Sequence, residues 1–190
     1  MASTTLRAIT ARYVKLLASA TPAQIEAGAQ WYDDAREYAR LIADNLNRQT
    51  TLFASYGEEA TIETGACILA AYSPNNRWAN NISCALRYSL GETVGGLYAK
   101  PAKLADIRAR GLAAITGPKL RAFARNIIGD PDAVTIDVWM ARAAKLSGEV
   151  PTAKEYRTCE AAIHAAARKY NLTPATAQAV VWVIQRGAAD

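Results

Sequence analysis

Residues 113–142 read AAITGPKLRAFARNIIGDPDAVTIDVWMAR, and this stretch decides how the rest of the chain is interpreted. An apolar run stops just before Gly117-Pro118, and a new helical pattern begins at Lys119 and ends at Gly129. We expect two helices joined by a tight turn, in which Gly117 tolerates a positive φ and Pro118 fits the first turn of the second helix. The unpaired backbone N–H groups at that helix start are suited to a phosphate.

The second feature of this stretch is an isolated acid. Segment 134–140 places one carboxylate, Asp137, inside an otherwise apolar run. A charge there must be paired, hydrogen bonded or shifted in pKa, and such groups are enriched at functional sites. Asp137 can equally cap a helix that begins at Val138, and the two interpretations are compatible. For Lys119 the residues alone favour a solvated lysine on a basic helix, because Arg121 and Arg125 follow on nearby turns.

Length and composition favour one compact domain over residues 1–190, because 190 residues with 51% hydrophobic composition can bury one sizeable core. No stretch alternates with the period of a strand, so the predicted class is an all-α bundle of about eight to ten helices. A polar, turn-rich connection is expected over residues 47–57. The patterns predict helices over 3–19, 22–46, 58–72, 77–90, 101–115, 119–128, 138–146, 152–170 and from 174 onward.

The net charge of +5 suits a polyanionic partner such as nucleic acid, although charge alone is weak evidence. The three cysteines lie far apart in the sequence, which favours free thiols in a reducing cytoplasm over disulfides or a zinc site. No apolar run approaches the roughly 20 residues of a membrane span, and the N-terminus lacks a signal-peptide core. We therefore expect a cytoplasmic protein, in the host cell if the chain is viral, with no membrane partner.

An asparagine-rich segment lies between two apolar helical patterns. It contains Asn75, Asn76, Trp78 and Asn81. Asparagine amides can read a base edge by paired hydrogen bonds while an indole stacks on the base. The alternative is that the amides cap helices and that Trp78 belongs to the core, and from the residues alone the two interpretations stand level.

Segment 113–142 resembles the helix-hairpin-helix and the following aspartate of the base-excision DNA glycosylase superfamily. That pattern is a Leu-Pro-Gly-Val-Gly hairpin, a lysine two residues on, and later Val-Asp-Thr-His before an arginine. Its second glycine, lysine, aspartate and arginine fall on Gly117, Lys119, Asp137 and Arg142. The sequence departs from the pattern at Ile115, which replaces the first glycine, at Pro118, and at Trp139, which stands where His is usual.

A closer likeness, over most of the chain, is to small phage-encoded proteins of the same superfamily. Some of these are linked to thymine hypermodification in viral DNA. The matching motifs are Gly28-Ala29-Gln30-Trp31-Tyr32, Ser73-Pro74-Asn75-Asn76-Arg77-Trp78-Ala79-Asn80, Gly117-Pro118-Lys119, Val134-Thr135-Ile136-Asp137 and Gln178-Ala179-Val180-Val181-Trp182. Gln178 and Trp182 share one helix face, which suits either core packing or the edge of a pocket.

The resemblance implies a compact two-lobed, glycosylase-like bundle with Asp137 and Lys119 as catalytic residues at the mouth of a cleft. The implied substrate and DNA-binding residues are Asn75, Asn76, Trp78, Asn81, Gly117, Trp139, Arg142, Gln178 and Trp182. The implied activity is transfer of an amino acid or amine onto a phosphorylated or pyrophosphorylated 5-hydroxymethyluracil that is flipped out of DNA. Excision of a modified base by a DNA N-glycosylase is the alternative, and a non-catalytic DNA-binding module is the third.

The partners implied by the resemblance are double-stranded DNA and a free amino acid as co-substrate. We expect a monomer with no metal centre and no required cofactor. A monovalent cation at the hairpin, or Mg²⁺ accompanying a diphosphate substrate, is compatible with the resemblance.

Overall fold

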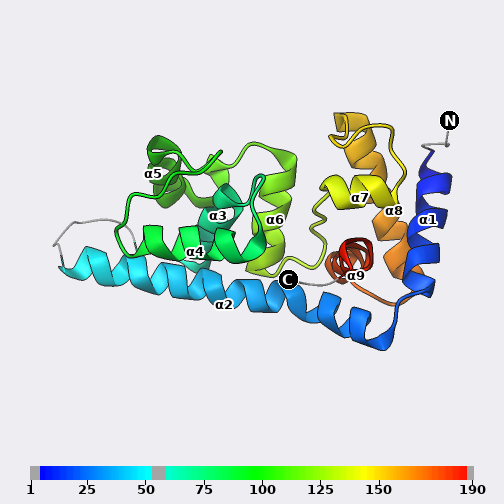
Figure 1. Ribbon diagram of the computed structural model, residues 1–190, viewed down its shortest axis with the longest axis horizontal. Coiled ribbons are helices and arrows are strands. Elements are labelled where there is room, and N and C mark those ends of the chain that lie inside the picture. The colour runs from blue at the N-terminus through cyan, green and yellow to red at the C-terminus, as the bar shows by residue number, and fades with distance from the viewer. Residues whose placement is uncertain (1–4, 53–58, 188–190) are drawn as a thin grey trace. The chain divides into compact units, whose positions relative to one another are not determined.

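The computed structural model describes residues 5–52 and 59–187, and every regular element within them is helical (Figure 1). This confirms the all-α class that the sequence predicts. The elements are α1 (Leu6–Ala18), α2 (Pro22–Leu52), α3 (Ile62–Tyr72), α4 (Trp78–Ser89), α5 (Pro101–Arg110), the 3₁₀ turn η1 (Gly111–Ala114), α6 (Pro118–Ile128), α7 (Val138–Ala143), α8 (Ala153–Lys169) and α9 (Pro174–Arg186).

The chain divides into two compact units. Unit 1 comprises Met1–Tyr32 and Asp130–Ala189, and unit 2 comprises Asp33–Gly129. Helix α2 contributes to both, because the boundary falls within it. That the chain forms a single two-lobed domain of the glycosylase type stays a prediction.

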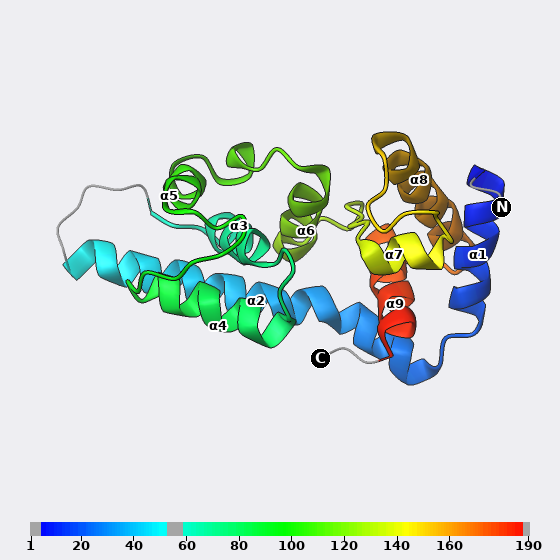
Figure 2. The ribbon, with the colours of Figure 1, turned by 45° about the horizontal axis from the view of Figure 1, so that its top comes forward.

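Unit 1 buries its core between α1, α8 and α9, and α7 packs against α9. Helices α1 and α8 lie side by side in both views (Figures 1 and 2). The extended segment 133–136, which precedes α7, is buried as well. The largest fully buried side chains of this unit are Ile9, Tyr13, Ile136, Met140 and Ile163.

Helix α3 is the centre of unit 2, since it packs against α4, α5 and α6. Every residue of Thr64–Tyr72 is buried, so this part of α3 has no solvent face. Gly65 permits the close crossing with α2, because a Cβ there would overlap the backbone carbonyl of Ala39. Helix α4 is held to α2 by a hydrogen bond of 3.0 Å from the Asn45 amide to the Ser89 hydroxyl.

Several predicted helix boundaries are wrong, including the start of α3, which begins at Ile62 instead of residue 58. Helix α2 continues to Leu52, so the connection predicted over residues 47–57 begins later, and residues 53–57 lie outside the described residues. Asn47 lies inside the helix, and its side-chain amide exchanges hydrogen bonds of 2.9 and 2.7 Å with the backbone of Ala60. Helix α7 ends at Ala143 instead of near residue 146, and Lys145 just beyond it has a positive φ of 53°.

The connection between α5 and α6 is also longer than predicted. Helix α5 ends at Arg110, and most of the apolar run that follows forms η1 instead of continuing the helix. The cause is Gly111, whose φ of 52° and ψ of −129° are open to glycine and strained for other residues. Gly117 does not use the positive φ that a glycine tolerates: its φ is −74° and it is the N-cap of α6, while Pro118 begins α6 as predicted.

We predict that Gly111→Ala lowers the free energy of unfolding by about 1–3 kcal/mol. The positive φ would be strained, and a Cβ would overlap the Glu63 carboxylate. Gly117→Ala is the matched control, because its φ is ordinary and no atom lies within 4 Å of an added Cβ. Gly117→Ala should lower the free energy of unfolding by less than about 1 kcal/mol, which is the usual effect of replacing an N-cap residue. Urea unfolding measures both, and equal losses would contradict the assignment.

Candidate functional site

Asp137 caps the first turn of α7 in unit 1. Its Oδ1 accepts hydrogen bonds from the backbone N–H groups of Trp139 and Met140, both at 3.0 Å. Its Oδ2 accepts a hydrogen bond of 3.0 Å from the indole Nε1–H of Trp182 on α9. The capping interpretation is confirmed, and the half-buried carboxylate is also held from a second helix.

The extended segment 133–136 fixes where Asp137 lies. Its backbone is buried outside any helix, so its polar groups need partners from elsewhere. The hydroxyl of Tyr156 on α8 donates to the Val134 carbonyl at 3.1 Å and accepts from the Ile136 N–H at 3.3 Å. One side chain thus binds two backbone groups, on either side of Thr135, shortly before the carboxylate.

A second buried tyrosine anchors the other side of the carboxylate. The hydroxyl of Tyr13 on α1 donates to the Met140 carbonyl at 3.2 Å. Burial raises the pKa of Tyr156 to about 12 and raises the pKa of Tyr13 further, and the negative charge of Asp137 acts in the same direction on both. Both hydroxyls are therefore held in the neutral form, which can donate.

The N-terminal and C-terminal motifs of the sequence meet in unit 1. The buried Tyr32 hydroxyl donates to the Oε1 of Gln178 at 2.6 Å. The rings of Trp31 and Trp182 pack with centroids 5.5 Å apart and planes tilted by 59°. Gly28 allows this approach, because a Cβ there would lie 2.7 Å from a backbone nitrogen of α9.

Two arginines of unit 1 stack on indoles beside the acid. The guanidinium of Arg142 lies over the Trp139 ring, and that of Arg186 lies over the Trp182 ring, each 4.8 Å from the ring centroid. Within the described residues of unit 1, no lysine or arginine forms an ion pair with Asp137. The carboxylate is held by neutral N–H donors alone.

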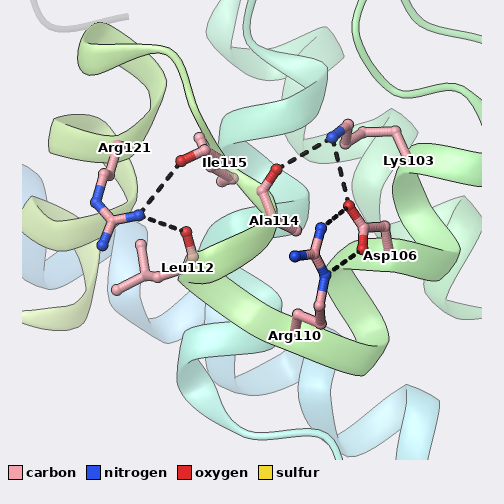
Figure 3. Close-up of polar contacts among 7 residues, drawn as sticks. All are labelled: Lys103, Asp106, Arg110, Leu112, Ala114, Ile115 and Arg121. Atoms are coloured by element: carbon pink, nitrogen blue, oxygen red, sulfur yellow. Dashed lines mark hydrogen bonds and ion pairs between the residues drawn. The ribbon is translucent and has the colours of Figure 1, made fainter.

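In unit 2, the hairpin carbonyls face cationic side chains of the same unit (Figure 3). Lys103 Nζ donates to the Ala114 carbonyl at 3.1 Å, and Arg121 donates to the carbonyls of Leu112 and Ile115 at 2.8 and 3.4 Å. A cation bound at these carbonyls would have to displace Lys103 and Arg121. In residues 5–52 and 59–187 no group of three His, Cys, Asp or Glu side chains is placed to hold a metal ion.

Two acidic side chains complete the contacts of this turn. Asp106 bonds to the guanidinium of Arg110 at 2.5 and 2.7 Å and to Lys103 at 3.5 Å, and these contacts hold its pKa below the usual value (Figure 3). The Glu63 carboxylate accepts from the Leu112 N–H at 2.8 Å. The turn is thus fixed by side chains from α3, α5 and α6.

The start of α6 is open to solvent. Lys119, its second residue, is exposed and forms no hydrogen bond or ion pair with the part of the chain that the structure describes. Gly117 has no heavy atom within 4 Å of the position of a Cβ. This end of unit 2 therefore offers backbone N–H groups beside exposed positive charge.

The asparagines before α4 have local roles in unit 2. Asn75 has a positive φ of 55°, which asparagine tolerates better than most residues. The Asn76 amide donates to the Tyr72 carbonyl at 3.1 Å, and so satisfies the end of α3. Ser73 also belongs to that helix end, because its hydroxyl donates to the Ala70 carbonyl at 2.8 Å.

Trp78 and Asn81 lie in the first turn of α4. The half-buried Trp78 ring contacts the rings of Tyr38 and Phe123 edge-on, with centroids 6.4 and 6.2 Å apart. Asn81 is 1% exposed, and its Oδ1 accepts no hydrogen bond from the described residues. Such a buried acceptor costs about 1–3 kcal/mol, so packing alone gives no reason for an asparagine at this position.

The predicted site residues fall into two groups. Those in unit 1 surround the acid and are Asp137, Trp139, Arg142, Gln178 and Trp182. Those in unit 2 lie at the starts of α4 and α6 and are Asn75, Asn76, Trp78, Asn81, Gly117 and Lys119. Because Asp137 and Lys119 belong to different units, their pairing stays a prediction.

Sequence reasoning missed several residues that support these groups. Gly111 and Glu63 shape the hairpin, while Tyr156 and Tyr13 anchor the backbone beside Asp137. A tyrosine on an apolar helix stripe reads as ordinary core, so no sequence signal marks the two tyrosines. Gly111 did carry a signal, because a glycine that interrupts a helical pattern often ends the helix.

The fold and the site together define an all-helical protein with a capped, half-buried acid in one unit and a basic helix start in the other. The chain belongs to the family of unknown function DUF7178, whose model matches residues 1–189. Neither the curated proteins nor the solved structures contain a match to it. None of the described helices combines the length and apolar composition that crossing a membrane requires.

We predict that Tyr156→Phe lowers the free energy of unfolding at pH 7 by about 1–3 kcal/mol, because two buried backbone groups lose their partner. The difference from the wild type should shrink between pH 10 and 12. In that range Tyr156 ionises in the unfolded chain but stays neutral in the folded one, which costs the wild type about 1.4 kcal/mol per pH unit. Urea unfolding across pH measures this, and a constant difference would contradict it.

Proposed function

We propose that this protein is a DNA base-modifying enzyme that transfers an amine onto an activated thymine-derived base, with Asp137 as its acid–base residue. The observation that carries the proposal is the set of contacts that the Asp137 carboxylate makes. It is half buried, fixed by three N–H donors, and without a cationic partner in the described residues of unit 1. A carboxylate that is positioned but not neutralised is able to accept a proton.

The transfer step follows from this role. The amine nitrogen forms a bond to the methylene carbon on C5 of the flipped uracil ring, and the bond from that carbon to the diphosphate oxygen breaks. The diphosphate leaves with the electron pair, and the proton that the amine loses passes to the Asp137 carboxylate. Positive charge on the protein, such as the guanidinium of Arg142, stabilises the leaving diphosphate.

The open start of α6 supports a DNA partner. Helix N-termini bind phosphate through unpaired N–H groups, and Gly117 places no side chain over them. The exposed Lys119 adds a positive charge, and contacts of this kind hold a DNA backbone without reading sequence. We assign backbone contacts to this part of unit 2 and proton transfer to unit 1.

The exposure of Lys119 favours transfer over excision through a lysine nucleophile. Desolvation is one way to activate a lysine that attacks a sugar carbon, and Lys119 is exposed to solvent in unit 2. As a contact to a phosphate or a diphosphate it needs no such activation. Excision and a non-catalytic DNA-binding role are kept as outcomes of the test.

We predict that Asp137→Asn abolishes turnover and leaves DNA binding unchanged. Asparagine is an equally good N-cap, so α7 stays formed while the proton acceptor is lost. The assay incubates the protein with DNA that contains thymine, 5-hydroxymethyluracil or its diphosphate ester, with and without amino acids, and analyses the nucleosides by mass. A heavier nucleoside together with released diphosphate is the expected result for the wild type.

Asp34→Asn is the matched control, because it removes an exposed carboxylate with the same change in charge. It should keep full turnover. Free base or abasic sites would replace the proposal with excision. Unchanged turnover in Asp137→Asn would overturn the role of Asp137. If the wild type bound DNA but modified none of these substrates, the protein would be a non-catalytic DNA-binding module.

We also predict that Lys119→Ala weakens DNA binding to a similar extent for all sequences and reduces the slope of log K against log salt by about 1. Lys169→Ala removes another exposed lysine and serves as the control. Fluorescence anisotropy with labelled duplexes at several salt concentrations measures both variants. An unchanged salt slope for Lys119→Ala would show that this ammonium does not contact a phosphate.

A further inference from the structure

The carboxylate of Asp137 has one acceptor position that the protein leaves open. A carboxylate oxygen accepts about two hydrogen bonds. Oδ1 already accepts two, from the N–H groups of Trp139 and Met140, whereas Oδ2 accepts one, from Trp182. The remaining position on Oδ2 can accept one further N–H donor.

The two arginines near Asp137 in unit 1 contact other groups. Arg142 stacks on the Trp139 ring and forms an ion pair with Glu149, and Arg186 stacks on the Trp182 ring. Both indoles belong to residues whose N–H groups bind Asp137. The arginines thus lie beside the carboxylate's own donors, and within the described residues of this unit neither forms an ion pair with it.

The surroundings of Asp137 also suit an organic cation. Trp31 and Trp182 are half buried and packed together, and Tyr32 meets Trp31 edge-on with centroids 4.9 Å apart. Aromatic faces attract ammonium and guanidinium groups. Arg186 demonstrates this attraction on the Trp182 ring itself.

We infer that Asp137, with the neighbouring Trp31–Trp182 pair, forms a binding site for a primary ammonium group that works in the absence of DNA. The inference rests on the proposed function, for which it names the recognition of the second substrate. The ammonium donates to Oδ2 and its alkyl chain packs on the aromatic rings. A neutral alcohol lacks the charge that the carboxylate attracts, and an anion is repelled.

The test titrates the full-length protein with n-butylammonium chloride and follows the indole N–H signals by NMR. The chain has four tryptophans, and Trp182→Phe assigns the signal of Trp182. Because Trp182 donates directly to Asp137, its signal should move and saturate with butylammonium. 1-Butanol, which has the same chain length, should leave that signal in place. The two ligands are compared on the wild type, and Trp182→Phe serves only to assign the signal.

Asp137→Asn should weaken butylammonium binding at least tenfold, and Asp34→Asn should bind as the wild type does. Equal responses to butanol and butylammonium, or unchanged binding by Asp137→Asn, would overturn the inference. Saturable ammonium binding that needs Asp137 supports the inference even if no DNA is modified. The absence of DNA modification would then count against the proposed function alone. Amine transfer onto DNA together with no ammonium binding would overturn the inference and keep the function.

Discussion

Backbone polar groups that are buried outside a helix must find partners in side chains, and unit 1 depends on how it meets this constraint. Segment 133–136 runs extended through the core, and the Tyr156 hydroxyl serves one carbonyl and one N–H of it. The position of the next residue, Asp137, follows from that anchoring. Helix α7 then starts from the Asp137 side chain, so the packing of α8 against the segment determines where a short helix begins.

The same carboxylate therefore serves the fold and the proposed chemistry. As an N-cap it satisfies two N–H groups of α7, and through Trp182 it joins α7 to α9. Neutral donors fix its geometry without cancelling its charge. A salt bridge with Arg142 or Arg186 would have fixed the geometry equally well, but it would have occupied the acceptor position that an incoming amine requires.

Four glycines show how differently one residue type is used. Gly28 and Gly65 lie at helix crossings, where a Cβ would meet the backbone of another helix. Gly111 turns the chain with a positive φ, and Gly117 is required by neither packing nor backbone conformation. An unconstrained glycine at an exposed helix start is understandable if that surface meets something outside the chain.

Local patterns in the sequence determined the helical class, most helix positions and the cap at Asp137, because helix periodicity, proline at a first turn and an acid before a helix act over a few residues. Tertiary structure alone decided that Tyr156 anchors segment 133–136, that Trp182 binds Asp137, and that Glu63 binds the Leu112 N–H. Each of these depends on residues brought together from distant parts of the chain, such as Glu63 beside Leu112. A local pattern cannot encode such contacts, because burial and hydrogen-bond partners are set only when the helices pack.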